Sequence, residues 1–283
     1  MLKILSSSFG LSLQDSGRFG YASYGVPLSG AMDQYASKLA NKLLNNPVEE
    51  AVLEITNGGC KLLFESKTSI CLTGADYSAA IDGKSLETNK VIHVDEGAVL
   101  SFVGRKYGFR TYLAVKNGFN VEIVLGSASM YQNLTSAPIL NKGDRLNIKS
   151  ISSFKKRSAA KVKIDLQHFY INNIDAFEGP EFELLDEFQQ QQLLETEFEI
   201  SPNNNRMGYQ LEQSIENSLP QMLTSSVLPG TVQLTPSGKL IILMRDCQVT
   251  GGYPRVLQLS EQAINRLAQK TTRDIIRFKL VAK

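Results

Sequence analysis

Short apolar segments separated by turn residues fill residues 51–115, and they constrain the fold more than any other feature. The segments with the length of β-strands are residues 51–55, 60–64, 69–72, 78–81, 91–94, 99–103 and 110–115. Glycine-containing turns lie between or after them, at residues 58–59, 82–83, 96–97 and 117–118. Strands this short, spaced by about ten residues, are typical of a barrel or a sandwich rather than a parallel α/β sheet. We therefore expect a mainly β protein with a few helices.

Three segments are predicted to be helical. In residues 31–44, apolar side chains recur at three- and four-residue steps, and Asp33 is placed to cap the helix. Residues 182–194 form a glutamine-rich helical stretch, with Leu184 and Phe188 among its apolar positions. Ser260 is placed to cap a last helix, before a final strand at residues 275–281.

A predicted hairpin in the second half leads to the most polar of the strand ends. Residues 231–234 and 240–244 are its strands, and the Thr235-Pro236-Ser237-Gly238 sequence suits a type I turn. Arg245 and Asp246 follow directly. Polar groups at a strand end, followed by glycines, are compatible with a small-molecule site, and equally with a tight loop held by an ion pair.

Composition excludes several classes of function. The 30 basic and 28 acidic residues give a formal charge of +2, which is too balanced to indicate nucleic acid or an anionic membrane. No apolar run approaches the roughly 18 residues that span a bilayer. Two histidines, three cysteines and no cysteine pair at ligand spacing argue against a metal site. So few cysteines, and no signal peptide at the start, favour the cytoplasm.

A series of motifs, in order along nearly the whole chain, resembles a known family. In the first half they are residues 14–20, 25–33, 40–41, 53–55, 72–76, 110–115 and 125–127. In the second half they are residues 205–208, 229–233 and 250–254. The chain is thereby similar to the KipA-like family, also called allophanate hydrolase subunit 2 or biotin-dependent carboxyltransferase-like. As an unfused chain it most resembles the C subunit of 5-oxoprolinase.

The resemblance implies two cyclophilin-like β-barrel domains. We expect the first at residues 1–150 and the second at residues 164–283. Residues 149–163 are rich in serine and lysine and are predicted to be the linker between them.

The resemblance also implies an activity and partners. The chain is expected to act in an ATP-dependent 5-oxoprolinase that hydrolyses 5-oxoproline to glutamate, together with a KipI-like B subunit and a third subunit. One alternative is carboxyl transfer to urea or a related amide, with carboxybiotin supplied by another protein. Another is a non-enzymatic antagonist of a KipI-like kinase inhibitor.

Charged residues within or beside the motifs are the candidates for chemistry. The predicted catalytic residues, which stabilise phosphate or carboxylate charge or orient a nucleophile, are Asp15, Arg18, Asp76, Arg206, Arg245 and Asp246. The predicted substrate-binding residues are Gln233, Thr250, Gly251, Gly252 and Tyr253. No metal is expected. The chain departs from the family pattern at residues 133–138 and 271–274, which puts loop-borne site residues in question more than the fold.

Overall fold

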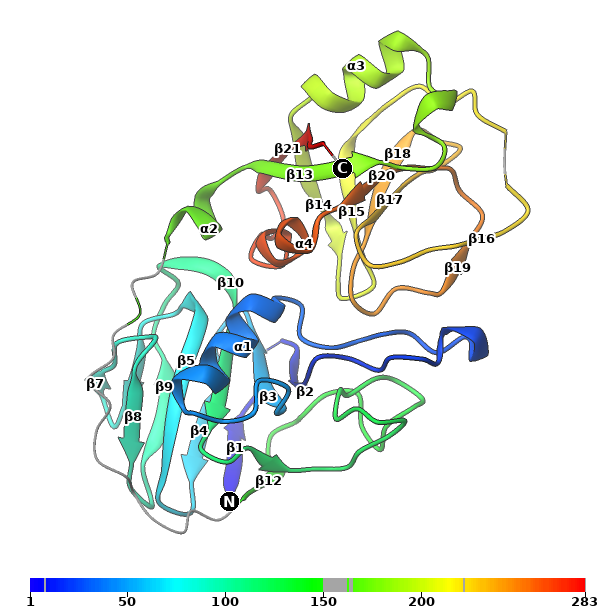
Figure 1. The fold of residues 1–283 in the computed structure, drawn as a ribbon. Coiled ribbons are helices and arrows are strands. Elements are labelled where there is room, and N and C mark those ends of the chain that lie inside the picture. The colour runs from blue at the N-terminus through cyan, green and yellow to red at the C-terminus, as the bar shows by residue number, and fades with distance from the viewer. Residues whose placement is uncertain (8, 150–161, 163–164, 221, 283) are drawn as a thin grey trace. The chain divides into compact units, whose positions relative to one another are not determined.

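The computed structural model describes residues 1–7, 9–149, 162, 165–220 and 222–282. The predicted mainly β fold is confirmed, with four α-helices in the described part of the chain. The chain forms two compact units (Figure 1). The first combines Met1–Arg18 with Ser29–Leu166, and the second combines Phe19–Leu28 with Gln167–Lys283. The predicted linker falls almost entirely on residues 150–161 and 163–164, which lie outside the described residues, so the domain limits stay a prediction.

The first unit contains two antiparallel sheets. The larger has the strand order β11 (Phe119–Asn120), β12 (Arg145–Ile148), β1 (Leu2–Ser6), β4 (Lys61–Phe64), β9 (Val99–Phe102), β6 (Ala79–Ile81) and β7 (Lys84–Ser85). The smaller has the order β2 (Leu11–Gln14), β3 (Val52–Thr56), β10 (Tyr107–Val115), β5 (Thr68–Asp76) and β8 (Val91–Val94). Seven of these twelve strands fall on the predicted segments. The other five, β1, β2, β7, β11 and β12, were not predicted.

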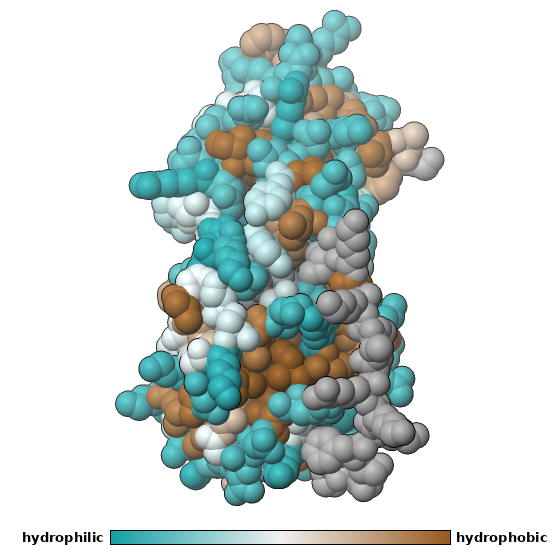
Figure 2. Space-filling model, turned by 90° about the vertical axis from the view of Figure 1, so that its left-hand side faces the viewer, coloured by the Kyte–Doolittle hydropathy of each residue, from teal (hydrophilic) through white to brown (hydrophobic). Residues whose placement is uncertain are grey.

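One hydrophobic core joins the two sheets. Strands alternate their side chains between two faces, and the inward residues of both sheets belong to a single buried cluster, including Ile4, Phe64, Ile55 and Leu113. Partly buried hydrophobic residues pack against this core, among them Ile81 and Phe102. Figure 2 shows that some hydrophobic side chains of this unit also reach its surface.

Helix α1 (Gln34–Leu43) covers the outer face of the smaller sheet, as Figure 1 shows. Ala36, Ala40 and Leu44 pack on Tyr112 and Cys71 in a second apolar cluster. The helix starts later than predicted, because Asp33 is its N-cap and accepts a hydrogen bond from the backbone N–H of Ala36 at 3.0 Å. The predicted capping role of Asp33 is therefore confirmed.

Two strands of the smaller sheet are longer than predicted. The strand predicted at residues 69–72 continues as β5 to Asp76. Gly74 has φ of +78°, and the pairing of β5 with β10 shifts register between Tyr107 and Thr111. A glycine inside a strand therefore marks a bulge here rather than the strand's end.

The second unit is a closed barrel. Its strand order is β13 (Asn173–Glu178), β20 (Arg255–Leu259), β17 (Thr231–Leu234), β18 (Lys239–Leu243), β15 (Gly208–Ser214), β14 (Phe198–Asn204) and β21 (Ile275–Leu280). Adjacent strands are antiparallel except β13 and β21, which run parallel. The short pair β16 (Ser225–Ser226) and β19 (Thr250–Gly251) forms a separate ladder.

In the second unit, α3 and α4 each begin directly after a residue that caps the helix. Ser260 caps α4 (Glu261–Leu267) by accepting from the N–H of Ala263, as predicted. The predicted helix at residues 182–194 is instead divided. A 3₁₀ turn, Phe182–Leu184, precedes α3 (Glu187–Glu195), because Asp186 and Gln189 form a capping box that starts a new helix. Leu184 and Phe188, expected on the apolar face, are exposed. The remaining helix, α2, is Gln167–Tyr170. None of the described helices is long and apolar enough to cross a membrane.

Candidate functional site

Three neighbouring strands of the barrel place a row of side chains on its outer face. The register pairs Gln210 of β15 with Ile241 of β18, and Ile241 with Gln233 of β17. The alternate residues of these strands, such as Val232 and Ile242, are fully buried and point into the barrel. The row of Gln210, Ile241 and Gln233 therefore faces outward, where a loop or a ligand can cover it.

A pocket of about 250 Å³ lies over this row. Its lining residues are Asn203, Asn205, Met207, Gly208, Gln210, Gln233, Ile241, Leu243, Gln248 and Tyr253. Five of them carry carboxamides, and none is an aspartate, glutamate, lysine, arginine or histidine. Carboxamides both donate and accept hydrogen bonds, so the pocket offers polar groups without charge.

Gln233 is the most buried polar residue of the pocket, with 2% of its surface exposed. Its Nε2 donates to the backbone oxygen of Tyr253 at 3.3 Å, which turns Oε1 the other way. A Cβ on Gly251 would lie 2.6 Å from Nε2 of Gln233. The absence of a side chain at Gly251 is therefore what leaves room for this carboxamide.

A small apolar cluster supports the pocket from beside the strands. Val227, Leu243 and Cys247 are buried together, and Ile241 packs against them. Burial, followed by the negative charge of Asp246, raises the pKa of the Cys247 thiol to about 12. The thiol is therefore protonated at neutral pH and does not act as a thiolate nucleophile.

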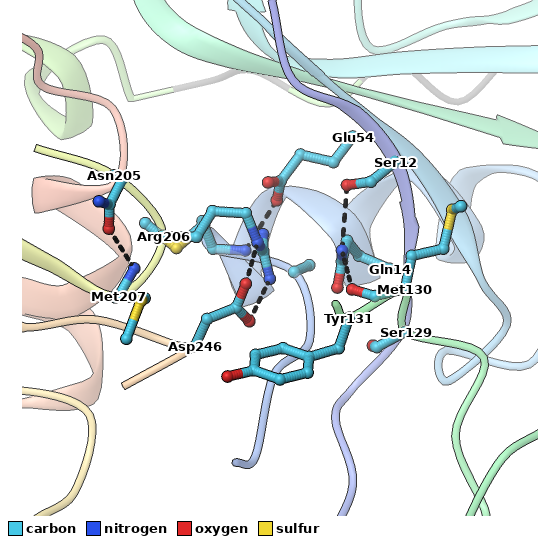
Figure 3. Close-up of polar contacts among 12 residues, drawn as sticks. Ser12, Gln14, Glu54, Ser129, Met130, Tyr131, Asn205, Arg206, Met207 and Asp246 are labelled. Carbon is cyan, nitrogen blue, oxygen red and sulfur yellow. Dashed lines mark hydrogen bonds and ion pairs between the residues drawn. The ribbon is translucent and has the colours of Figure 1, made fainter. Parts of the chain in front are cut away.

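Arg206 and Asp246 form an ion pair next to the pocket lining (Figure 3). Nε of Arg206 donates to Oδ2 of Asp246 at 2.7 Å, and Nη2 donates to Oδ1 at 2.9 Å. The backbone adds a bond from the N–H of Asp246 to the oxygen of Arg206 at 2.8 Å. Arg206 stands between two lining residues, Asn205 and Met207, so the pair fixes this edge of the pocket to the segment after β18.

Arg245 does not line the pocket, and its side chain contacts helix α4. Its guanidinium donates to both carboxylate oxygens of Glu261 and, at 3.2 Å, to Oδ1 of Asn265, both on α4. Arg245 and Asp246 were open to interpretation as an ion pair that holds a tight loop. Each instead has a partner distant in sequence, so this strand end is held by two separate interactions.

Asp15 and Arg18 stabilise a turn of the first unit. The Asp15 carboxylate accepts four hydrogen bonds, from Oγ of Ser127 and Ser129 and from the N–H groups of Gly17 and Ala128, at 2.6–2.8 Å. Arg18 is buried and donates to the backbone oxygens of Val124 and Ser129. The Ser127 and Ser129 hydroxyls thus bind a carboxylate that the protein itself supplies.

Asp76, the last predicted catalytic residue, ends β5. Its Oδ1 accepts from the N–H of Ser78 at 2.7 Å, and its Oδ2 pairs with Nζ of Lys106 at 3.1 Å. All six predicted catalytic residues therefore make intrachain contacts. Of the predicted substrate-binding residues, Gln233 and Tyr253 line the pocket, whereas Thr250, Gly251 and Gly252 do not.

A buried polar cluster in the first unit was missing from the predicted site. Glu54 pairs with Nε of Arg110 at 3.7 Å and accepts from the N–H of Met32 at 2.8 Å. The Tyr112 hydroxyl accepts from the N–H of Asp33 at 2.7 Å, which fixes the start of α1. Burial, followed by the charges of Glu54 and Asp33, raises the pKa of Tyr112 well above its ordinary value. The sequence did contain one indication of this cluster, because Glu54 is a charged residue in the middle of the otherwise mainly apolar run 52–56.

In the part of the chain that the structure describes, no group of three or more His, Cys, Asp and Glu side chains is placed to hold an ion. Fold and pocket together define a two-unit β protein with a small, uncharged, carboxamide-lined pocket on one barrel.

Comparison with known proteins gives the family. Residues 24–280 match the carboxyltransferase domain family, subdomains A and B, and the chain belongs to it. It is 34% identical to the 5-oxoprolinase C subunit of Escherichia coli over 275 residues, which cover 95% of this chain and 87% of that protein. The corresponding protein of Haemophilus influenzae is 31% identical over 288 residues, covering 100% of this chain and 92% of that one. The predicted family resemblance is thereby confirmed.

A solved structure extends the likeness to a larger enzyme. K. lactis urea amidolyase superposes with a TM-score of 0.89 at 26% identity, over 99% of this chain and 19% of that protein. This chain therefore has the fold of one part of a much longer polypeptide.

Proposed function

We propose that the chain is the C subunit of an ATP-dependent 5-oxoprolinase that opens the lactam of 5-oxoproline to give glutamate. The observation that carries this proposal is the near end-to-end similarity to two bacterial 5-oxoprolinase C subunits. A KipI-like B subunit and a third subunit complete the proposed complex. Three buried cysteines without a disulfide are consistent with the reducing cytoplasm that we propose for it.

The pocket supports a role in binding the substrate amide. Lactam hydrolysis requires the carbonyl to be polarised and the ring to be held while phosphate and water act on it. Gln233 and the carboxamides around it offer hydrogen bonds to an uncharged amide. We assign ATP to the complex rather than to this pocket, since about 250 Å³ is below the ~300–1,000 Å³ of typical ligand pockets.

The predicted catalytic residues take positioning roles in this proposal. Arg206 and Asp246 hold the pocket edge, and Arg245 holds the segment after β18 to α4. Asp15 and Arg18 organise the turn at residues 124–129. Asp76 holds the end of β5 to Lys106. Acid–base and phosphate chemistry is then left to the assembled complex, and the isolated chain is expected to show little turnover.

The test is reconstitution of the complex. The chain is purified together with its KipI-like and third partners, and glutamate release from 5-oxoproline is followed with and without ATP. We expect ATP-dependent release by the three-component complex and none by any component alone. An intact complex that releases no glutamate overturns the proposal. Gln233→Leu and Asp246→Asn should lower turnover while leaving the complex assembled, with Asp95→Asn, an exposed carboxylate, as the control.

A second candidate is carboxyl transfer from carboxybiotin to urea or a related amide. The superposition on urea amidolyase favours it. This activity requires biotin on another protein, since the chain has no lysine between two methionines to carry it. Avidin blotting of the source cells tests this candidate, because the transferase needs a biotinylated partner and a blot without any biotinylated protein contradicts it.

A further inference from the structure

We propose that the outer-face pocket of the barrel binds the amide group of a small cyclic amide by itself, without ATP or a partner protein, and that Gln233 is its principal contact. The recognised group is a neutral N–H and C=O pair on a ring. That this ring is the lactam of 5-oxoproline rests on the function proposed above, whereas binding of the amide does not.

The hydrogen-bonding state of Gln233 carries the argument. Nε2 of Gln233 donates to the oxygen of Tyr253, and among the described residues Oε1 accepts no hydrogen bond. Oε1 is not among the fully buried side-chain atoms of the described residues that lack a partner, so this oxygen keeps surface open to the pocket. An acceptor held in place at a buried pocket wall is complementary to an N–H donor. The ligand is therefore expected to present an N–H group to Oε1.

The remaining walls define the rest of the ligand. Ile241 and Leu243 supply apolar surface beside Gln233, which suits ring methylenes. Gln210, next to Ile241 in the register, supplies a second carboxamide that can donate to the ligand carbonyl. One amide flanked by apolar carbons matches a lactam better than a sugar or an amino acid.

The charge and the volume of the pocket limit the class of ligand further. Because no charged side chain lines the pocket, a carboxylate has no countercharge there and must remain at the mouth. A volume of about 250 Å³ suits a single ring. The pocket should thus bind the amide group of 5-oxoproline, and the carboxylate of this ligand should stay outside it. The uncharged analogue 2-pyrrolidinone, which has the same ring, should bind about as well.

Gly251 offers a substitution that moves Gln233 directly. Its φ lies outside the left-handed region, so alanine is compatible with the backbone there. The added methyl would lie 2.6 Å from Nε2 of Gln233 and force this carboxamide to shift. Gly104→Ala is the matched control, because its methyl meets no atom within 4 Å and its φ is also ordinary.

The experiment is a titration of the complete chain, free of ATP and partners, followed by calorimetry and by ¹H–¹⁵N NMR. The probes are 2-pyrrolidinone, 5-oxoproline and cyclopentanone, which keeps the ring and carbonyl but lacks the N–H. We expect the first two to bind within about threefold of each other, and cyclopentanone about tenfold or more weakly, because it leaves Oε1 unpaired. Gly251→Ala should lose at least about tenfold for the two amides, and Gly104→Ala should not.

Several outcomes overturn the proposal. These are a folded wild-type chain that binds neither amide, cyclopentanone binding as well as 2-pyrrolidinone, and unchanged amide binding by folded Gly251→Ala. Thermal melting establishes folding for each variant. The two proposals fail separately: a chain that binds 2-pyrrolidinone in a complex that releases no glutamate contradicts only the proposed function. A complex that turns over while the chain binds neither amide contradicts only the pocket assignment.

Discussion

Arg206 and Asp246 lie 40 residues apart and meet through two parallel hydrogen bonds of 2.7 and 2.9 Å. Both side chains are largely buried, with 20% and 11% of their surfaces exposed. Salt screens the attraction between two buried charges less than that between two exposed ones. Removing one partner of a buried pair leaves the other charge poorly solvated. The geometry therefore couples the pocket edge at residues 205–207 to the stability of the barrel.

Asp246→Asn is expected to destabilise the chain by about 1.5–3 kcal/mol. Each carboxylate oxygen accepts one hydrogen bond from the guanidinium, and asparagine replaces one of these oxygens with an NH₂ group that faces another donor. Urea denaturation gives the free energy of unfolding. Arg206→Lys should cost nearly as much, since an ammonium group does not reproduce the planar fork. Arg145→Ala, whose pair with Glu65 is half exposed, is the control and should change stability by less than about 1 kcal/mol. Equal losses in all three variants would contradict the coupling.

Arg245 and Glu261 should behave asymmetrically when truncated. Arg245 is 5% exposed in its side chain, whereas Glu261 is 61% exposed. Glu261→Ala leaves Arg245 bonded to Asn265, and because Glu261 is exposed, water can replace its carboxylate beside the guanidinium, so the loss should be the smaller one, about 1–2 kcal/mol. Arg245→Ala removes both contacts and the packing of the side chain, and should cost about 2–4 kcal/mol. The two free energies of unfolding check this, and a Glu261→Ala loss as large as that of Arg245→Ala would be inconsistent with it.

Asp15→Asn is expected to cost about 2–4 kcal/mol and to disorder the turn at residues 124–129. The carboxylate accepts from four donors, and an amide in its place must turn an NH₂ group toward at least one of them. Hydrogen exchange of the Ala128 and Ser129 amides measures the local effect. Ser127→Ala removes a single donor and should cost only about 1 kcal/mol. A catalytic base without this structural role would instead show wild-type exchange in Asp15→Asn.

Local chemistry explains which parts of the fold could be predicted. The hairpin of β17 and β18 was evident because its turn places Pro236 and Gly238 where they are needed, and the N–H of Gly238 does bond to the oxygen of Thr235. The caps at Asp33 and Ser260 were predictable for the same reason. Each depends on residues within four positions of one another.

The pocket could be predicted only in part, because it depends on long-range pairing. Gln233 and Tyr253 were named from their motifs, but Gln210 joins them only through the register of β15 on β18. Asn205 and Gln248 come from segments held in place by the ion pair of Arg206 with Asp246. A period-2 pattern gives the faces of one strand, not which strands are neighbours, so the row of carboxamides was not visible in the sequence.

Glu181 and Arg255 give a pH-dependent prediction. The Arg255 guanidinium donates two hydrogen bonds to the Glu181 carboxylate, at 2.8 and 3.0 Å, and these bonds lower the pKa of Glu181 below its ordinary value. The folded state then binds fewer protons than the unfolded state at acid pH. The stabilisation is complete above the unfolded pKa of about 4.3 and is lost as the pH falls through the lower folded pKa.

Glu181→Gln should therefore be less stable than the wild type at pH 7, and the difference should shrink as the pH is lowered below about 4, because both chains then carry a neutral group there. Urea denaturation at several pH values measures this difference. Glu183→Gln removes the same charge from an exposed neighbouring residue and is the matched control. It should stay within about 0.5 kcal/mol of the wild type at every pH. A Glu181→Gln difference that is independent of pH would show that the residue stabilises the barrel by packing rather than by its charge.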